Sequence, residues 1–172
     1  MSERAGLVTL KGNPIKVSGP GIKVGDKAPD FKVTANDLST KTLADCAGKV
    51  VILSSVPSLD TAVCDKSTRK FNEDASKVPG VVIVTVSRDL PFAQKRWCGA
   101  AGIQNVMTLS DFRDHSFGKA YGYEITDGAL AGLLARAIVV IDKTGVIRYE
   151  QIVPEIAQEP DYDKALAVAK GL

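Results

Sequence analysis

The chain has 172 residues, of which 45% are hydrophobic and 24% charged, a composition ordinary for a globular protein long enough to bury a core of its own. Its 22 basic and 20 acidic residues leave a net charge of +2 and are spread along the sequence, so we expect no nucleic-acid partner. No apolar run approaches the roughly 18 residues that span a bilayer, and the first 17 residues lack the hydrophobic segment of a secretory signal. We therefore expect no membrane association and a cytoplasmic location.

The first quarter of the chain predicts a hairpin, a loop and a helical turn. VTLKGNPIKV (8–17) is typical of two short strands around a Gly-Asn-Pro turn, and the Gly- and Pro-rich residues 18–31 predict a loop. TLADCAGK (42–49) predicts a short helical turn that ends at a glycine. The β-branched run at 50–53 then predicts a strand that is buried on both faces.

The hydrophobic period changes after Pro57. Thr61, Cys64, Thr68 and Phe71 recur at positions i, i+3, i+7 and i+10, with Lys and Arg between them. This spacing places the four side chains on one stripe of a helix, so we predict a helix that begins shortly after Pro57.

The rest of the chain alternates strands and helices. We predict, in order, a strand at 81–87, a helix at 90–99 with Pro91 in its first turn, a strand at 105–109, a short helix at 116–122, strands at 135–142 and 146–153 joined by a Lys-Thr-Gly turn, and a helix at 159–172. This alternation predicts a three-layer α/β fold with a mixed central sheet. No repeat or linker marks a second domain, so we expect residues 1–172 to form a single domain.

Three cysteines, Cys46, Cys64 and Cys98, are too few for a disulfide scaffold, and at least one must stay unpaired within a monomer. No two of them are spaced as a CxxC pair, and the single histidine, His115, has no neighbouring ligand, so we expect no metal site. Most cysteines in a reducing compartment are buried and inert, and a chemical role needs a further argument.

Cys64 has such an argument. It lies near the start of a predicted helix, where unpaired N–H groups and the positive end of the helix dipole favour an anion, and the thiolate is the reactive form of cysteine. Thr61 shares its helix face and can offer a hydroxyl to the sulfur or to a substrate oxygen, while Pro57 closes the preceding turn. On these residues alone, a nucleophile and a buried structural cysteine remain equally open.

The charges around Cys64 require a cation from elsewhere in the fold. Asp60 and Asp65 would oppose a thiolate if they faced it. Arg69 follows Cys64 by five residues, about 500° around the helix, and therefore points away from it. Arg136, at the start of a strand predicted in the same sheet, is the better candidate.

The motif around Cys64 resembles a known family. PSLDTAVC (57–64) fits the Pro-x-x-x-Thr-x-x-Cys pattern of the peroxiredoxins, which are peroxidases that use a cysteine and neither metal nor haem. The chain is similar over nearly its whole length to their thiol peroxidase branch, which has two active cysteines in one chain. The matching segments are KGNPIKV (11–17), DLPFAQKRWCG (89–99), LSDFR (109–113), LARAIVVID (134–142) and EPDYDKALA (159–167).

The resemblance implies a thioredoxin-like fold with an added N-terminal hairpin and no cofactor. It implies that Cys64 is the peroxidatic cysteine and that Cys98 is the resolving cysteine, which forms a disulfide with it. Thr61 and Pro57 would belong to the active-site motif, and Arg136 would be the cationic partner of the thiolate. It also implies a hydroperoxide substrate, hydrogen peroxide or organic, a thioredoxin-type reductant and a homodimer.

Cys46 falls outside the family pattern, and we interpret it as a small packing residue. Two other functions are weighed against the peroxidase. A thiol–disulfide oxidoreductase acting on protein disulfides would usually carry a CxxC pair, which is absent here. A thioredoxin-fold binding or chaperone module would carry its cysteines incidentally, and substitution of Cys64 would leave its activity intact.

Disulfide formation between the two implied cysteines predicts a movement. Cys64 and Cys98 lie on separate predicted helices, and a disulfide requires their Cα atoms within about 7 Å. We therefore expect local unwinding around one or both cysteines, which Trp97, the only tryptophan, would report.

Overall fold

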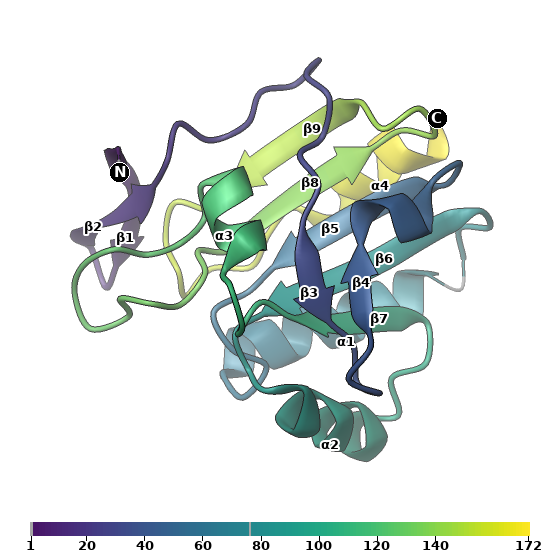
Figure 1. Cartoon of the computed structure of the whole chain (residues 1–172), viewed down its shortest axis with the longest axis horizontal. Helices are drawn as coiled ribbons and strands as arrows, with labels where there is room; N and C mark the ends of the chain where they lie inside the picture. Colours follow the sequence, from purple (N-terminus) through teal and green to yellow (C-terminus); the bar gives the residue numbers. More distant parts are fainter. Residues whose placement is uncertain (1, 76) are drawn as a thin grey trace.

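A computed structural model describes residues 2–75 and 77–172, and its centre is a seven-stranded mixed sheet in the order β4-β3-β7-β6-β5-β8-β9 (Figure 1). Two further strands, β1 (Glu3–Leu10) and β2 (Asn13–Ser18), form a separate hairpin. The strands of the main sheet are β3 (Lys32–Thr34), β4 (Thr40–Thr42), β5 (Val50–Ser55), β6 (Val81–Ser87), β7 (Val106–Ser110), β8 (Ala137–Ile141) and β9 (Ile147–Ile152). The helices are the 3-10 turn η1 (Leu43–Cys46), α1 (Ala62–Ala75), α2 (Pro91–Ala101), α3 (Ser116–Tyr121) and α4 (Tyr162–Lys170). The predicted fold class, α/β with a mixed sheet, is confirmed.

Helices cover both faces of the sheet, which gives the three layers (Figure 1). All six residues of β5 are buried, as the unbroken apolar run predicted, because β5 is central and pairs in parallel with β6 and antiparallel with β8. On one face α1 and α4 pack on the sheet through Phe71, Ala165 and Leu166. On the other face α3 packs through Phe117 and Tyr121.

The N-terminal hairpin forms as predicted, but its turn begins one residue earlier than the predicted Gly-Asn-Pro. Lys11 and Gly12 make the turn with φ values of 50° and 80°, whereas Asn13 and Pro14 belong to β2. Two consecutive residues with positive φ define the type I′ turn, whose twist suits a two-residue hairpin, and glycine adopts it without strain.

Two predictions about the elements need correction. Strands β3 and β4 were not predicted, since three residues are too few to show a period of two. Thr61 lies outside the buried stripe of α1, because the helix begins one residue after it and its side chain is exposed. Cys64, Thr68 and Phe71 are fully buried, as the stripe predicted. Within the described ranges, no helix combines the length and apolar character needed to cross a membrane.

Candidate active site

Cys64 is the third residue of α1 and is 0% exposed. The chain leaves the end of β5, passes through a loop that contains the buried Pro57, and enters α1. The Cys64 side chain packs against Val56 and Leu59, with Trp97 partly covering the cluster. The sulfur therefore lies in an apolar pocket at the first turn of a helix, where backbone N–H groups lack partners within the helix.

Arg136 lies beside this sulfur. Strands β5 and β8 pair antiparallel with Ser55 opposite Ala137, so the residue before β8 is placed at the end of β5, where the loop to Cys64 begins. Arg136 is 1% exposed, and its Nη2 donates a hydrogen bond of 3.1 Å to Cys64 Sγ. Its Nε donates to the Ile156 carbonyl at 3.0 Å. The guanidinium thus brings a fixed positive charge and a hydrogen-bond donor to the sulfur.

The third nitrogen of the same guanidinium is uncommitted. Arg136 Nη1 is buried and lacks a hydrogen-bond partner among the described residues. Buried donors are nearly always satisfied in folded proteins, so an unsatisfied one beside a cysteine sulfur is suited to binding a polar atom of a ligand.

The acidic residues near Cys64 do not oppose a thiolate. Asp65 Oδ1 accepts a hydrogen bond of 2.8 Å from Trp97 Nε1, and its Oδ2 accepts one of 2.8 Å from Arg69 Nε. Its carboxylate is thus turned toward Trp97 on α2 and paired with Arg69 on α1. Arg69 points away from Cys64, as its helical spacing predicted, and Asp60 is exposed.

The Thr61 hydroxyl is engaged within its own loop. Thr61 Oγ1 donates to the Ser58 carbonyl at 3.0 Å, and the Thr61 carbonyl accepts the Asp65 N–H at 2.9 Å as α1 begins. Thr61 therefore shapes the loop and the first helical turn, and its hydroxyl would have to leave Ser58 to reach the sulfur or a substrate.

Cys98 lies on α2, and its sulfur has other partners. The Cys98 Sγ is 3.2 Å from Thr108 Oγ1 on β7 and accepts a long hydrogen bond of 4.0 Å from Asn36 Nδ2. Within the described residues Cys46, Cys64 and Cys98 are all free thiols. Cys64 and Cys98 thus have different partners, Arg136 just before β8 for Cys64 and Thr108 on β7 for Cys98.

Asp89 is a site residue that sequence reasoning missed. Its carboxylate accepts hydrogen bonds from Ser58 Oγ at 2.7 Å, Leu59 N at 2.8 Å and Ser87 Oγ at 2.7 Å. It therefore ties the loop before Cys64 to the start of α2. In the sequence, an aspartate just before a helix that begins with proline suggests a helix cap. That common role gives no indication that the Asp89 carboxylate contacts Leu59, 30 residues earlier in the chain.

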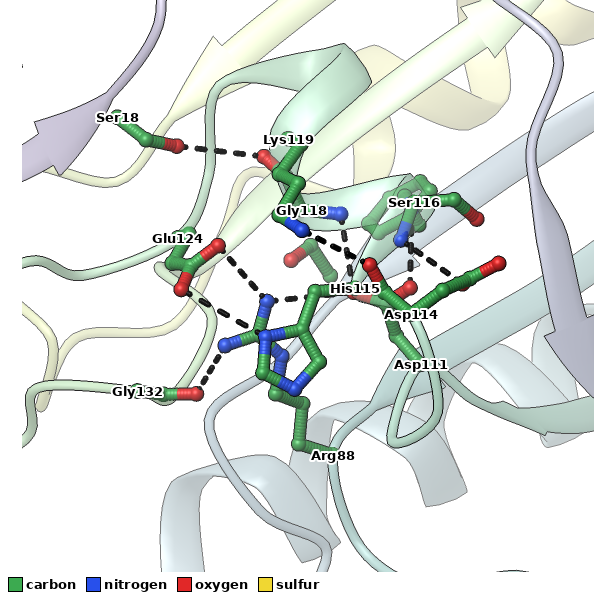
Figure 2. A network of polar contacts seen from close by, with 12 residues as sticks. Ser18, Arg88, Asp111, Asp114, His115, Ser116, Gly118, Lys119, Glu124 and Gly132 are labelled. Atoms are coloured by element: carbon green, nitrogen blue, oxygen red, sulfur yellow. Dashed lines mark hydrogen bonds and ion pairs between the residues drawn. The ribbon is translucent and has the colours of Figure 1, made fainter. Parts of the chain in front are cut away.

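A buried charge network lies next to Asp89 (Figure 2). The Arg88 guanidinium pairs with Asp111 at 3.5 Å and Glu124 at 3.1 Å, and it also donates to the Gly132 carbonyl. Burial raises the pKa of Asp111, although two backbone N–H groups and Arg88 oppose that shift. Burial also acts to raise the pKa of Glu124, but hydrogen bonding and charge from Arg88 outweigh it and lower that pKa. The network fixes the chain at Gly132, shortly before Arg136.

Cys46 lies away from this site, at the end of η1. It is partly buried and packs against the main apolar cluster of the sheet. Burial raises the pKa of its thiol and the nearby Asp45 adds to the effect, so the thiolate is disfavoured. A search of the described residues finds no group of three or more His, Cys, Asp and Glu side chains that could hold a metal ion.

Comparison with known proteins shows strong similarity to one family. Residues 23–166 match the family model described as Redoxin. A thiol peroxidase of Halalkalibacterium halodurans is 55% identical, covering 95% of this chain and 97% of that protein, and a thiol peroxidase of Bacillus subtilis is 51% identical, covering 96% and 97%. The crystal structure of a peroxiredoxin-like protein from Aquifex aeolicus superposes with a TM-score of 0.92 at 48% identity and covers 97% of this chain and 98% of that chain.

Proposed function

This chain belongs to the thiol peroxidases of the redoxin family, and from that premise we propose that Cys64 is its nucleophile, Cys98 its resolving thiol and Arg136 the cation that serves Cys64. Pro57 and Thr61 complete the loop that shapes the first turn of α1. The substrates are hydroperoxides, hydrogen peroxide or organic, and the electrons come from a thiol reductant.

The contact between Arg136 and Cys64 is the observation that carries this proposal. A fully buried thiol is usually inert, but here a buried guanidinium donates to it at 3.1 Å and the Asp65 carboxylate is turned away. The thiolate is the form that attacks peroxides, and a fixed positive charge stabilises it. The side chains that cover the sulfur, Leu59 and Trp97 among them, have to shift to admit a substrate.

The first step oxidises Cys64. Its thiolate attacks the terminal oxygen of ROOH, the O–O bond breaks, and the leaving alkoxide takes a proton to give ROH. We propose that Arg136 Nη1, which is buried without a partner among the described residues, and the N–H groups of the first turn of α1 hold the peroxide oxygens and stabilise the negative charge on the leaving oxygen. The product on the enzyme is a sulfenic acid.

The second step forms a disulfide. The Cys98 thiol attacks the Cys64 sulfenic acid, water leaves, and a Cys64–Cys98 bond forms. An external dithiol protein, which we propose to be of the thioredoxin type, then restores both thiols by exchange and becomes oxidised itself. We propose that this cycle runs in the cytoplasm, where thiol reductants keep cysteines reduced.

We also propose that the protein is a homodimer, as in the family that the sequence resembles. The exposed side chains of Leu90 and Phe92 at the start of α2 offer apolar surface that a second copy would cover. Sedimentation of the wild type and of Phe92→Glu tests this: a dimer that becomes a monomer in the variant is expected, and a monomeric wild type would contradict it.

Peroxide consumption by reduced protein without reductant tests the proposed chemistry. Wild type is expected to consume one equivalent per chain and to lose two free thiols, because one peroxide yields one disulfide. Cys98→Ser is expected to consume peroxide while losing only the Cys64 thiol, and Cys64→Ser to consume none. Equal consumption by Cys64→Ser and wild type would contradict the assignment, and a protein that reduces protein disulfides but no peroxide would be an oxidoreductase of another kind.

A further inference from the structure

The sulfur of Cys98 belongs to a closed ring of three polar side chains. Cys98 Sγ lies 3.2 Å from Thr108 Oγ1, Thr108 Oγ1 donates to Asn36 Oδ1 at 3.3 Å, and Asn36 Nδ2 points back to Cys98 Sγ at 4.0 Å. The three residues come from α2, from β7 and from the turn between β3 and β4. The Thr108 side chain is buried, so its hydroxyl depends on these partners.

One arrangement of protons satisfies this ring, and it requires a thiol. The Cys98 S–H donates to Thr108, the Thr108 hydroxyl donates to Asn36, and the Asn36 amide donates to the sulfur. A disulfide sulfur has no proton to donate and, bonded to Cys64, would have left this position. The ring therefore stabilises the reduced protein, with Cys98 on α2, and not the disulfide form. A contact that forms in only one of two states shifts the equilibrium toward that state.

We propose that Asn36 and Thr108 are the resting site of the resolving thiol: they hold Cys98 on a helical α2 in the reduced protein and so set how often α2 unwinds to deliver Cys98 to Cys64. This inference rests on the proposed function, in which Cys98 has to reach Cys64. Asn36 and Thr108 are positioning residues, since they act through Cys98 and do not touch the peroxide.

The packing of α2 makes such a site effective. The buried residues of α2 are Pro91 and Gln94, both in its first half. The second half is held by side-chain contacts to different neighbours: Trp97 donates to Asp65 on α1, Cys98 contacts Thr108, and Arg69 Nη1 donates to the Ala101 carbonyl at 3.4 Å. A segment with so little buried surface has a low free energy of local opening, and the loss of one hydrogen bond changes its open population measurably.

Amide hydrogen exchange of the reduced protein tests the site without any peroxide. Thr108→Val removes the hydroxyl and keeps the shape of the side chain, whereas Thr108→Ser keeps the hydroxyl. In Thr108→Val, amides at 97–101 are expected to exchange about five-fold faster than in wild type, the factor for loss of one ordinary hydrogen bond, and in Thr108→Ser near the wild-type rate. Asn36→Ala removes the other partner and is expected to act in the same direction as Thr108→Val.

Thr85→Val is the matched control. Thr85 lies on β6 directly opposite Thr108, is equally buried, and its hydroxyl lacks a hydrogen-bond partner in the described part of the chain. Thr85→Val therefore measures the effect of losing a buried threonine hydroxyl from the sheet without losing a contact to Cys98. Amide exchange at 97–101 is expected to match wild type in this variant.

A single turnover measures the consequence for resolution. Free thiols are quenched at intervals after one equivalent of hydroperoxide, and the sulfenic acid and the Cys64–Cys98 disulfide are quantified by mass. Thr108→Val is expected to form the disulfide about five-fold faster than wild type and to oxidise Cys64 at the wild-type rate, because the site bears on opening and not on peroxide attack.

Three results would overturn the proposal: unchanged exchange at 97–101 in both Thr108→Val and Asn36→Ala, the same acceleration in Thr108→Ser as in Thr108→Val, or the same acceleration in Thr85→Val. Failure of the proposed function would look different. Wild type would then form no Cys64–Cys98 disulfide with peroxide, while the exchange comparison would still decide whether Asn36 and Thr108 hold Cys98.

Discussion

Arg136 is both a buried part of the site and the positive charge beside Cys64. A buried guanidinium is costly unless its charge and its donors are matched, and the described contacts are a carbonyl oxygen of Ile156 and the Cys64 sulfur. In the proposed reaction, negative charge develops at Cys64 and on the leaving oxygen, and a peroxide oxygen would give Nη1 an acceptor.

Substitution of Arg136 should separate its charge from its geometry. Arg136→Met removes both, and the second-order rate of Cys64 oxidation is expected to fall about 100-fold, which corresponds to the loss of about 3 kcal/mol from a charge-assisted hydrogen bond. Arg136→Lys keeps the charge without the fork of donors, and an intermediate rate is expected. Stopped-flow oxidation of reduced protein measures both, with circular dichroism as the control for folding. A wild-type rate in Arg136→Met would contradict the role of this residue.

The sequence predicted some site residues better than others. The position of Cys64 at the start of a helix follows from local periodicity, and the proximity of Arg136 follows from strand order. The contacts of Asp89, Asn36 and Thr108 join segments 10 to 72 residues apart through polar atoms, as in Cys98–Thr108 and Asn36–Thr108. Such contacts leave no periodic pattern in the sequence, because they form only when helices and strands pack against one another.

At the scale of elements, α2 is the helix that we propose unwinds when Cys98 reaches Cys64. Trp97 is partly buried over the Cys64 cluster, with its indole N–H on Asp65 and the Arg69 guanidinium 5.7 Å from its ring centre. When Cys98 leaves its place to reach Cys64, the adjacent Trp97 loses this setting. The proposed unwinding of the second half of α2 would therefore change the surroundings of Trp97.

Trp97 emission should follow disulfide formation. Oxidation of wild type is expected to shift the emission to longer wavelength, because the indole moves from a partly apolar cluster into water. In Cys98→Ser, Cys64 is oxidised but no disulfide forms, so the emission is expected to stay near that of the reduced protein. Fluorescence spectra of both proteins before and after one equivalent of hydroperoxide test this, and identical spectra for reduced and oxidised wild type would exclude a rearranged α2.

Element boundaries were predicted well where burial imposes a pattern. Strand β6 has the predicted limits. Helix α3 ends at Tyr121, one residue earlier than predicted, because Gly122 forms its left-handed cap. The short strands β3 and β4 and the place of the hairpin turn were missed or misplaced. Strands of three residues are formed by tertiary pairing more than by their own sequence.

At the scale of the whole molecule, the N-terminal hairpin supports the active site from a distance. The backbone of Thr9 pairs with Pro154 and Ile156, and Ile156 is the residue whose carbonyl holds Arg136. The Glu155 carboxylate closes this arrangement, accepting from Thr9 Oγ1 at 2.7 Å, Lys11 N at 3.0 Å and Gly12 N at 3.1 Å. These hydrogen bonds lower the pKa of Glu155 from its ordinary 4.5 to about 2, and the bond from Thr9 has the largest effect.

The docking of the hairpin should therefore weaken in acid. A carboxyl whose pKa is lower in the folded protein stabilises it above the unfolded pKa, and this contribution is lost as the pH falls from about 4.5 through about 2. Glu155→Gln is expected to be less stable than wild type at pH 7, with a difference that shrinks across that window. Urea unfolding of both proteins at several pH values measures it, and a difference independent of pH would show that the Glu155 charge does not contribute.

The most direct test of the account is a peptide map under non-reducing conditions after one equivalent of hydroperoxide, with the remaining thiols alkylated. The account predicts a Cys64–Cys98 linkage with Cys46 alkylated, because Cys64 is the proposed nucleophile, Cys98 the resolving thiol, and Cys46 a packing residue whose thiolate is disfavoured. Three alkylated, unoxidised cysteines would contradict it, and so would a linkage that joins Cys46 to either of the others.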